Sequence, residues 1–293
     1  MKTLKTIGLL GFGEVGQRLA DDLSALPDVS LCAWDVQFRT EGSGPVLAVR
    51  SRSRVAAVGS ARELAGDCDL VISAVTAKEA TAAAASVLGG VAPGTFVLDV
   101  NSVAPGTRRR TAETIESAGG RFVEAAVMSP IAPAGIASPM LLGGPHAAEF
   151  RQMAVPLGFS NSSVCSADWG VASATKMCRS IMVKGVEALF AESLLTARHY
   201  GVESSVIASL DNLFGSGDQA ALARYMILRS VRHGERRNEE MREAAETVEE
   251  AGLEPWMSRA SARRQGWVSQ FKAALDCEDL DSVLDSIRSE MRC

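Results

Sequence analysis

Short apolar runs alternate with helical patterns over the first half of the chain. Alanine-rich or charged helical patterns separate several of the runs, notably over 80–88 and 106–118. The apolar runs cover residues 5–10, 30–35, 55–59, 69–75, 95–101 and 121–127. Apolar strands that alternate with helices predict a parallel sheet with helices on both faces.

The pattern changes after about residue 165. One helical run extends from Val171 to Tyr200, with Ser166 or Asp168 as candidate N-caps and Gly201 as its stop. The segments beyond it lack alternating β-branched residues and also predict helices. They are 203–213, 218–232, 235–251, 256–275 and 279–291.

A glycine-rich string joins the first strand to the first helix and has the G-x-G-x-x-G spacing of dinucleotide-binding turns. Gly11 permits the tight turn, Gly13 the close approach of a pyrophosphate, and Gly16 the packing of helix on strand. The helix N-terminus adds N–H groups and partial positive charge. The residues predicted to bind the dinucleotide here are Gly11, Phe12, Gly13, Glu14, Val15 and Gly16.

These patterns together predict an α/β fold in two domains. A Rossmann domain with a doubly wound parallel sheet covers residues 1–165. An all-α domain for substrate binding and dimerisation covers residues 166–293. The length of 293 residues suffices for two hydrophobic cores of ordinary size.

Asp35 ends the second apolar run, near the separation of ~20 residues expected of an acid that binds the ribose. A carboxylate there accepts both ribose hydroxyls and repels a 2′-phosphate, which favours NAD as the cofactor. Arg39 keeps NADP open, because a guanidinium can bind that phosphate. Later strand ends should line the same crevice, unless their polarity is only that of ordinary loops. They carry Ala74, Val75, Thr76, Asn101 and Ser102.

Lys176, Ser180 and Lys184 recur one turn apart on the long helix and share one face. A partly desolvated lysine beside a nicotinamide can exchange a proton with a substrate hydroxyl or carbonyl oxygen during hydride transfer. Two solvated lysines on an amphipathic helix explain the same spacing. The spacing alone favours the solvated lysines over the catalytic interpretation.

Several further features follow one another along the chain: GLLGFGEVGQRLADDL (8–23), FVEAAVMSPIAPAG (122–135), DWGVASATKMCRS (168–180) and Glu192. In this order they resemble the β-hydroxyacid dehydrogenases, the family of 6-phosphogluconate and 3-hydroxyisobutyrate dehydrogenases, whose corresponding helix carries a glutamate. The resemblance covers essentially the whole chain. It implies hydride transfer between a nicotinamide and a small hydroxy acid of the 3-hydroxyacid type. It also implies that Lys176 is the acid/base that serves the substrate oxygen.

The substrate-binding half departs from the family pattern. In the substrate-binding segment, Glu124, Met128, Ser129 and Pro130 replace the usual acid, serine and two glycines. In the catalytic segment, Ala167 and Ala172 replace glycines, and Ser180 replaces an asparagine. The tail, with RHGERRNEEM (232–241) in place of the family's K-D-L segment, resembles a subgroup of phosphogluconate-dehydrogenase-like proteins. We expect an altered pocket floor, and substrate contacts from Met128, Ser129, Pro130, Ser180 and Lys184.

A basic run follows in the second domain and comprises Arg229, Arg232, His233, Arg236 and Arg237. Guanidinium groups match carboxylates, but such a run is also typical of a solvated helix face, balanced here by Glu235, Glu239 and Glu240. We expect a solvated face for most of it and retain His233 and Arg236 as candidate substrate-binding residues. His146 and His199 are expected to be structural.

The composition limits the classes of binding partner that we expect for this chain. The net charge of -5 gives no electrostatic reason to expect nucleic acid or an anionic membrane. The six cysteines are scattered without metal-ligand spacing, so we expect reduced thiols, no metal site and a cytoplasmic location. The chain shows no signal-peptide pattern and no apolar stretch near the ~20 residues of a membrane span. A small-molecule carboxylate is the expected partner.

Three functions remain open. The first is an NAD(P)-dependent dehydrogenase or reductase that acts on a hydroxy acid. The second is an imine reductase, although a lysine suits a hydroxyl or carbonyl better than an iminium cation. The third is a dinucleotide-binding regulatory protein without turnover, which the substitutions in the substrate segment and at Ser180 allow.

The long helix also bears on assembly. Gly185 lies at the middle of this helix. The C-terminal part of the chain carries more apolar surface than one small helical domain can bury by itself. We therefore predict a homodimer, in which the partner's C-terminal helices are available to complete the active site.

Overall fold

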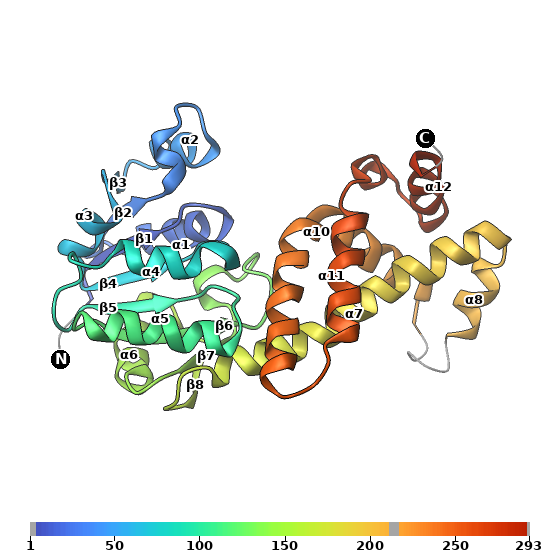
Figure 1. Ribbon diagram of the computed structural model, residues 1–293. Coiled ribbons are helices and arrows are strands. Elements are labelled where there is room, and N and C mark those ends of the chain that lie inside the picture. The colour runs from blue at the N-terminus through green and yellow to red at the C-terminus, as the bar shows by residue number, and fades with distance from the viewer. Residues whose placement is uncertain (1–3, 211–216, 292–293) are drawn as a thin grey trace. The chain divides into compact units, whose positions relative to one another are not determined.

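The structure is a computed structural model, and it describes residues 4–210 and 217–291 of the chain. The chain divides into two compact units, Met1–Lys176 and Met177–Cys293. The division falls inside helix α7 (Val171–Tyr200), which is yellow in Figure 1. The sequence-based boundary at residue 165 stays a prediction.

A sheet of eight strands forms the centre of the first unit, in the order β3-β2-β1-β4-β5-β6-β7-β8. The strands are β1 (Thr6–Leu10), β2 (Ser30–Trp34), β3 (Val55–Ala57), β4 (Leu70–Ser73), β5 (Phe96–Asp99), β6 (Arg121–Val127), β7 (Met140–Gly143) and β8 (Ser162–Ser166). Neighbouring strands run parallel except β6 and β7, which are antiparallel. β2 and β3 extend the sheet on one side of β1, and β4 to β8 extend it on the other side. The strand order therefore reverses between β1 and β4, which is the topological switch point. The predicted doubly wound α/β fold is confirmed.

Helices cover both faces of this sheet. They are α1 (Glu14–Ser24), α2 (Gly44–Arg50), α3 (Ala61–Gly66), α4 (Ala80–Ser86), α5 (Pro105–Ser117) and α6 (Ala147–Ala154), and Figure 1 shows α4 and α5 alongside the strands. Leu19 of α1 and Phe150 of α6 belong to one core, and Leu64 of α3 and Ile115 of α5 belong to the other. Side chains along a strand alternate between the faces, so the apolar run of β4 contributes to both cores.

Two strands and three short helices lie outside the segments that the sequence pattern predicts. β7 reads MLLG and lies between β6 and β8, whereas β8 is at the edge of the sheet and reads SSVCS with three consecutive exposed positions. An edge strand is covered on fewer sides than a central one and needs no continuous apolar run. The helices α2, α3 and α6 are six to eight residues long, too short to show a clear periodicity.

The second unit is helical throughout its described residues, as predicted. Besides most of α7 it contains α8 (Glu203–Ser209), α10 (Gln219–Glu250), α11 (Trp256–Val268), a 3-10 turn η5 (Lys272–Asp276) and α12 (Leu280–Glu290). Phe190 of α7, Ile227 of α10 and Leu284 of α12 pack into one buried core. Residues 211–213 of the helix expected over 203–213 lie outside the described residues.

The prediction of two helices over 218–232 and 235–251 is wrong, because α10 is continuous across Gly234. A Cβ atom at Gly234 would lie 2.2 Å from the carbonyl oxygen of Gln265 in α11. The glycine therefore permits two helices to approach closely and does not mark a joint.

Five cysteines of the described chain are free thiols, whereas Cys293 lies outside it. No described helix has both the length and the apolar character to span a bilayer. Within the described ranges, no group of three or more His, Cys, Asp or Glu side chains is arranged to hold a metal ion.

Candidate functional site

The glycine-rich turn lies at the carboxyl end of β1. Gly11 has a φ of 94°, and its N–H donates to the carbonyl of Trp34 at the end of β2 (2.9 Å). A Cβ atom added to Gly11 would lie 2.5 Å from the carbonyl oxygen of Ala74. A Cβ atom added to Gly16 would lie 2.2 Å from the carbonyl oxygen of Gly11. The turn therefore packs too tightly for a side chain at either glycine.

Gly13 differs from these two glycines. It is exposed at the N-cap of α1, and a Cβ atom added to it would meet no described atom within 4 Å. Glu14 and Val15 open the helix directly behind it. Space beside the N-terminus of a helix at the switch point suits a pyrophosphate. Phe12 offers only its backbone, since its ring is buried against Phe38.

Asp35 is bound to the glycine-rich turn. The N–H of Phe12 donates to its Oδ2 (2.8 Å), and the N–H of Gln37 donates to its Oδ1 (2.8 Å). Arg39 is exposed at the end of the following 3-10 turn. These bonds hold the carboxylate beyond β2, where an acid that binds the ribose is expected.

The ends of β4 and β5 meet beside the turn. The N–H of Ala74 donates to the carbonyl of Leu10 (2.8 Å), and the N–H of Val75 donates to Oδ1 of Asn101 (2.7 Å). The Asn101 amide also donates to the Ser73 hydroxyl (2.9 Å). Thr76 follows, exposed. Asn101 thus joins the two strand ends, and its role as a direct cofactor ligand stays a prediction.

The expected substrate-binding segment follows β6. The N–H of Met128 donates to the carbonyl of Pro139 (2.9 Å), and the Ser129 hydroxyl donates to the carbonyl of Pro130 (3.0 Å). Met128 and Ser129 are half-buried, and Pro130 is exposed. The three residues lie at the same carboxyl edge of the sheet as the glycine-rich turn.

A buried ionic network lies under this edge and was not predicted. Arg108 of α5 is 1% exposed, and its Nη1 contacts Asp99 Oδ1 of β5 at 2.6 Å. Its Nε lies 3.6 Å from Glu124 Oε2 of β6 and donates to the Ser173 hydroxyl of α7 (3.0 Å). The signals in the sequence were Asp99 and Glu124, acids inside the apolar runs 95–101 and 121–127. Arg108 gave none, because it lies in an arginine triplet typical of a solvated helix.

Glu124 also caps α7, which begins at Val171 as predicted. Its carboxylate accepts the N–H groups of Gly170 (3.0 Å) and Ala172 (2.9 Å). The two candidate N-caps are wrong, because Gly170 directly precedes the helix and its carbonyl accepts the N–H of Ala174 (2.8 Å). Ser166 lies in β8, and Asp168 precedes the helix by three residues. The Glu124 carboxylate is buried and faces the N-terminus of α7. It therefore does not form part of the floor of a substrate pocket, contrary to our expectation from the sequence.

Lys176 is half-buried and lies three residues after Ser173 on α7. Residues three apart in a helix are neighbours on one face. The ionic network therefore reaches α7 on the face that carries Lys176.

A second polar cluster lies on α7 and α10 in the second unit. The Lys184 ammonium is 3.3 Å from the Ser180 hydroxyl and forms an ion pair with Glu240, which also lies 3.9 Å from Arg236. Lys184 is 7% exposed, so the interpretation as a solvated lysine is wrong. Burial lowers the pKa of Lys184, and the Glu240 carboxylate opposes that shift. His233 is half-buried on α10.

Arg237 also departs from the expected solvated helix face. It is 3% exposed and forms an ion pair with Glu187 of α7, which is fully buried. Gln265 of α11 donates to the same carboxylate (3.3 Å). The α10 helix presents Arg237 to the interior because α7 and α11 cover that side of it.

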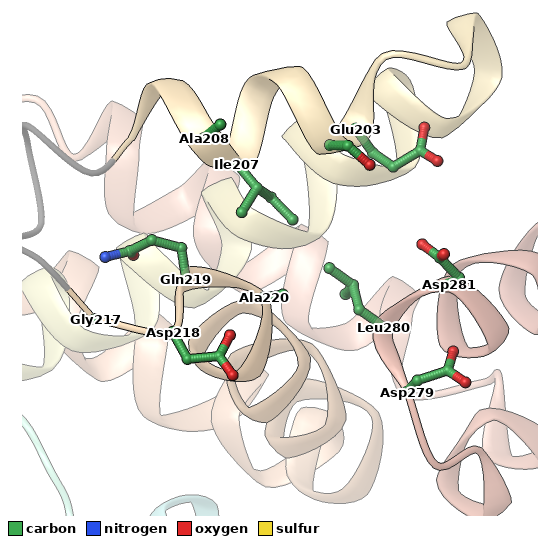
Figure 2. A pocket seen from close by; sticks show the side chains of 11 residues that line it. Glu203, Ile207, Ala208, Gly217, Asp218, Gln219, Ala220, Asp279, Leu280 and Asp281 are labelled. Carbon is green, nitrogen blue, oxygen red and sulfur yellow. The ribbon is translucent and has the colours of Figure 1, made fainter.

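A pocket of about 490 Å³ opens in the second unit (Figure 2). Its lining residues are Glu203, Ser204, Ile207, Ala208, Gly217, Asp218, Gln219, Ala220, Asp279, Leu280 and Asp281. The carboxylates have structural tasks: Asp218 caps α10, Asp279 caps α12, and Glu203 pairs with Arg198. The negative charge of these carboxylates would repel a carboxylate substrate from the pocket.

Two family models match the chain. Residues 6–157 match the NAD binding domain of 6-phosphogluconate dehydrogenase. Residues 197–268 match a domain of unknown function (DUF1932). The first match covers the glycine-rich turn, Asp35, Asn101 and the segment after β6.

Solved structures extend the similarity to the whole chain. A conserved hypothetical protein from Sinorhizobium meliloti is 32% identical over 97% of each chain, with a TM-score of 0.73. A conserved protein of unknown function, described as structurally similar to 3-hydroxyacid dehydrogenases, is 30% identical over 93% of this chain and 100% of its own, with a TM-score of 0.69. The 3-hydroxyisobutyrate dehydrogenase of Mycobacterium tuberculosis, solved with L-serine, shares the fold at 20% identity, covering 98% and 100% of the chains with a TM-score of 0.71.

Proposed function

Since the chain belongs to the β-hydroxyacid dehydrogenase family and carries the NAD binding domain of 6-phosphogluconate dehydrogenase, we propose that it is a nicotinamide-dependent oxidoreductase. The bound cofactor would exchange a hydride with the carbinol carbon of a small hydroxy acid of the 3-hydroxyacid type. The observation that carries the proposal is the tight Gly11 turn beside an open helix N-terminus at the switch point of the sheet.

Lys176 is the proposed acid/base of this reaction. Its amine accepts the proton of the substrate hydroxyl during oxidation, and its ammonium returns a proton to the carbonyl oxygen during reduction. The proposed substrate contacts are the residues that the sequence indicates, namely Met128, Ser129, Pro130, Ser180, Lys184, His233 and Arg236. Lysine and arginine among them would attract a carboxylate.

A substrate screen tests this function. The purified chain is assayed with a panel of small hydroxy acids and NAD or NADP, and with cyclic imines and the reduced cofactors. Oxidation of a hydroxy acid supports the proposal. Turnover confined to the imines would identify an imine reductase, and tight cofactor binding without any turnover would indicate a regulatory protein.

A Gly13→Ala variant tests the dinucleotide site directly. The added methyl group enters open space in the free protein but occupies the path by which a pyrophosphate approaches the backbone. We expect the Kd for NAD to rise by at least about tenfold, a loss of roughly 1.4 kcal/mol. The melting temperature should fall by only about 1–3 °C, because alanine is a poorer N-cap than glycine. Isothermal titration calorimetry and thermal unfolding measure the two quantities.

Gly44→Ala is the matched control for this variant. Gly44 also lies at the start of a helix, α2, and a Cβ atom there would likewise meet no described atom within 4 Å. Its Kd for NAD should equal that of the parent protein. Equal Kd values for all three proteins would refute the assignment of Gly13.

Asp35 is proposed to favour NAD over NADP. An Asp35→Asn variant removes the negative charge that repels a 2′-phosphate and weakens the hydrogen bonds to the ribose. Hydrogen bonds to charged groups contribute about 1.5–3 kcal/mol, so the Kd for NAD should rise by roughly 10- to 100-fold while that for NADP falls. Asp28→Asn, at the exposed amino end of β2, should change neither Kd. An unaltered NAD/NADP ratio in Asp35→Asn would contradict this role.

We also propose that the protein forms a homodimer through α7. Gly185 does not support this proposal, because a Cβ atom added to it would lie 3.8 Å from the Ser261 hydroxyl of the same chain. The support comes instead from Met182 and Leu189, which are 68% and 58% exposed two turns apart on one helix face. Sedimentation velocity at micromolar concentration should give the dimer mass, and charged substitutions at both residues should give the monomer mass.

A further inference from the structure

We propose that Arg108, Glu124 and Ser173 are positioning residues that hold Lys176 at the dinucleotide-binding edge of the sheet. The inference rests on the proposed role of Lys176 as the acid/base. It concerns groups that touch neither substrate nor cofactor and that act through the first turn of α7.

The first link runs from the strand ends to Arg108. The N–H of Val75 at the end of β4 donates a hydrogen bond to Oδ1 of Asn101 (2.7 Å). Nη2 of Arg108 donates a hydrogen bond to the backbone carbonyl of Asn101. The same guanidinium contacts both the carboxylate and the carbonyl of Asp99 at the end of β5 (2.6 and 3.2 Å). Arg108 therefore fixes two strand ends of the edge at which the dinucleotide is expected.

The second link runs from Arg108 to α7. Nε of Arg108 donates to the Ser173 hydroxyl (3.0 Å), which donates in turn to Oε2 of Glu124 (3.1 Å). The Glu124 carboxylate holds the N–H groups of Gly170 and Ala172, at the point where the helix begins. Position and direction of the first turn are thus set by side chains from α5 and β6.

Burial makes this arrangement rigid. Arg108, Glu124 and Ser173 are at most 2% exposed, so water does not compete for their hydrogen bonds. The guanidinium is planar and its donors have fixed directions, unlike those of an ammonium group. Lys176 follows Ser173 by three residues, on the same helix face. A shift of the Ser173 backbone therefore moves Lys176 relative to the strand ends.

Ser173→Ala is the principal test, because it removes one hydroxyl and leaves both carboxylates paired with Arg108. Misplacement by about 1 Å can cost about 100-fold in rate, so we expect kcat to fall by roughly 10- to 100-fold with little change in the Kd for NAD. The pH profile of kcat should shift as well, since the proton acceptor has moved. Arg108→Lys, which keeps the charge but loses the planar donors, should lower kcat further.

Thr175→Ala is the matched control. Thr175 lies in the same part of α7, is exposed, and donates only to the carbonyl of Val171 within the helix (3.0 Å). Its kcat and pH profile should match those of the parent protein. If Ser173→Ala also matches the parent in both, the positioning role is refuted.

A measurement without turnover separates this inference from the proposed function. Reductive ¹³C-methylation places an NMR reporter on Lys176, assigned with a Lys176→Arg variant. NAD addition should shift this resonance in the parent protein and in Thr175→Ala, and should shift it less in Ser173→Ala. Equal shifts in all three proteins would overturn the positioning role even if no hydroxy acid is turned over. Shifts of the expected pattern together with an absent turnover would overturn the reaction alone.

Discussion

Replacement of Lys176 by methionine is expected to lower kcat for the hydroxy acid by about 100- to 10,000-fold, the usual contribution of a positioned acid/base. Methionine keeps the length and the apolar stem of lysine but can neither accept nor return a proton. The half-buried site at the start of α7 tolerates such a side chain, so the fold and the Kd for NAD should be retained. Steady-state kinetics and calorimetry measure the two effects.

Lys5→Met serves as the control for this variant. Lys5 is exposed next to the amino end of β1, at the edge of the sheet opposite to the glycine-rich turn. The same substitution there should leave kcat unchanged. Full turnover by Lys176→Met, with normal NAD binding, would show that another group handles the proton.

Replacement of Arg237 by methionine is expected to destabilise the second unit by about 3–5 kcal/mol, the cost of leaving a buried charge without its partner. Glu187 is fully buried and forms ion pairs with two residues of α10, Arg237 and, at 3.7 Å, the more exposed Arg229. Without Arg237, the distant Arg229 and the neutral Gln265 compensate the buried carboxylate only in part. Hydrogen exchange measured by mass spectrometry should show the loss of protection in peptides from α10 and α11.

Two further variants test the cause of this loss. Arg259→Met breaks an ion pair with Glu249 in which the arginine side chain is 53% exposed, and should cost about 0–1 kcal/mol. Glu187→Leu combined with Arg237→Met removes both buried charges and should recover most of the protection, because paired apolar replacements are often neutral. A double variant as unstable as Arg237→Met would mean that packing, and not the buried charge, dominates.

Much of the dinucleotide-binding half was predictable because its determinants are local. The turn needs a positive φ at Gly11 and no side chain at Gly16, and three glycines at fixed spacing encode both. Asp35 follows its strand directly, so the apolar run locates it at the carboxyl edge. The β8 strand escaped prediction because a polar edge strand leaves no periodic trace.

The side chains that surround α7, the helix that carries Lys176, were not predictable in the same way. The start of α7 is capped by Glu124, 46 residues before Gly170 in the chain, and no local pattern records that pairing. Arg108 and Arg237 have the sequence context of solvated helix residues and are nevertheless buried, each beside a carboxylate from another element. Gly234 resembles a helix end and permits close helix packing instead.

The sequence by itself determined the two-part fold, the glycine-rich turn and the helix that carries Lys176. These follow from periodicity and from backbone conformations that only certain residues adopt. The tertiary structure alone decided which charges are buried and which side chains hold the start of α7. Contacts between residues far apart in the chain depend on how sheet and helices pack, and that packing has no counterpart in local spacing.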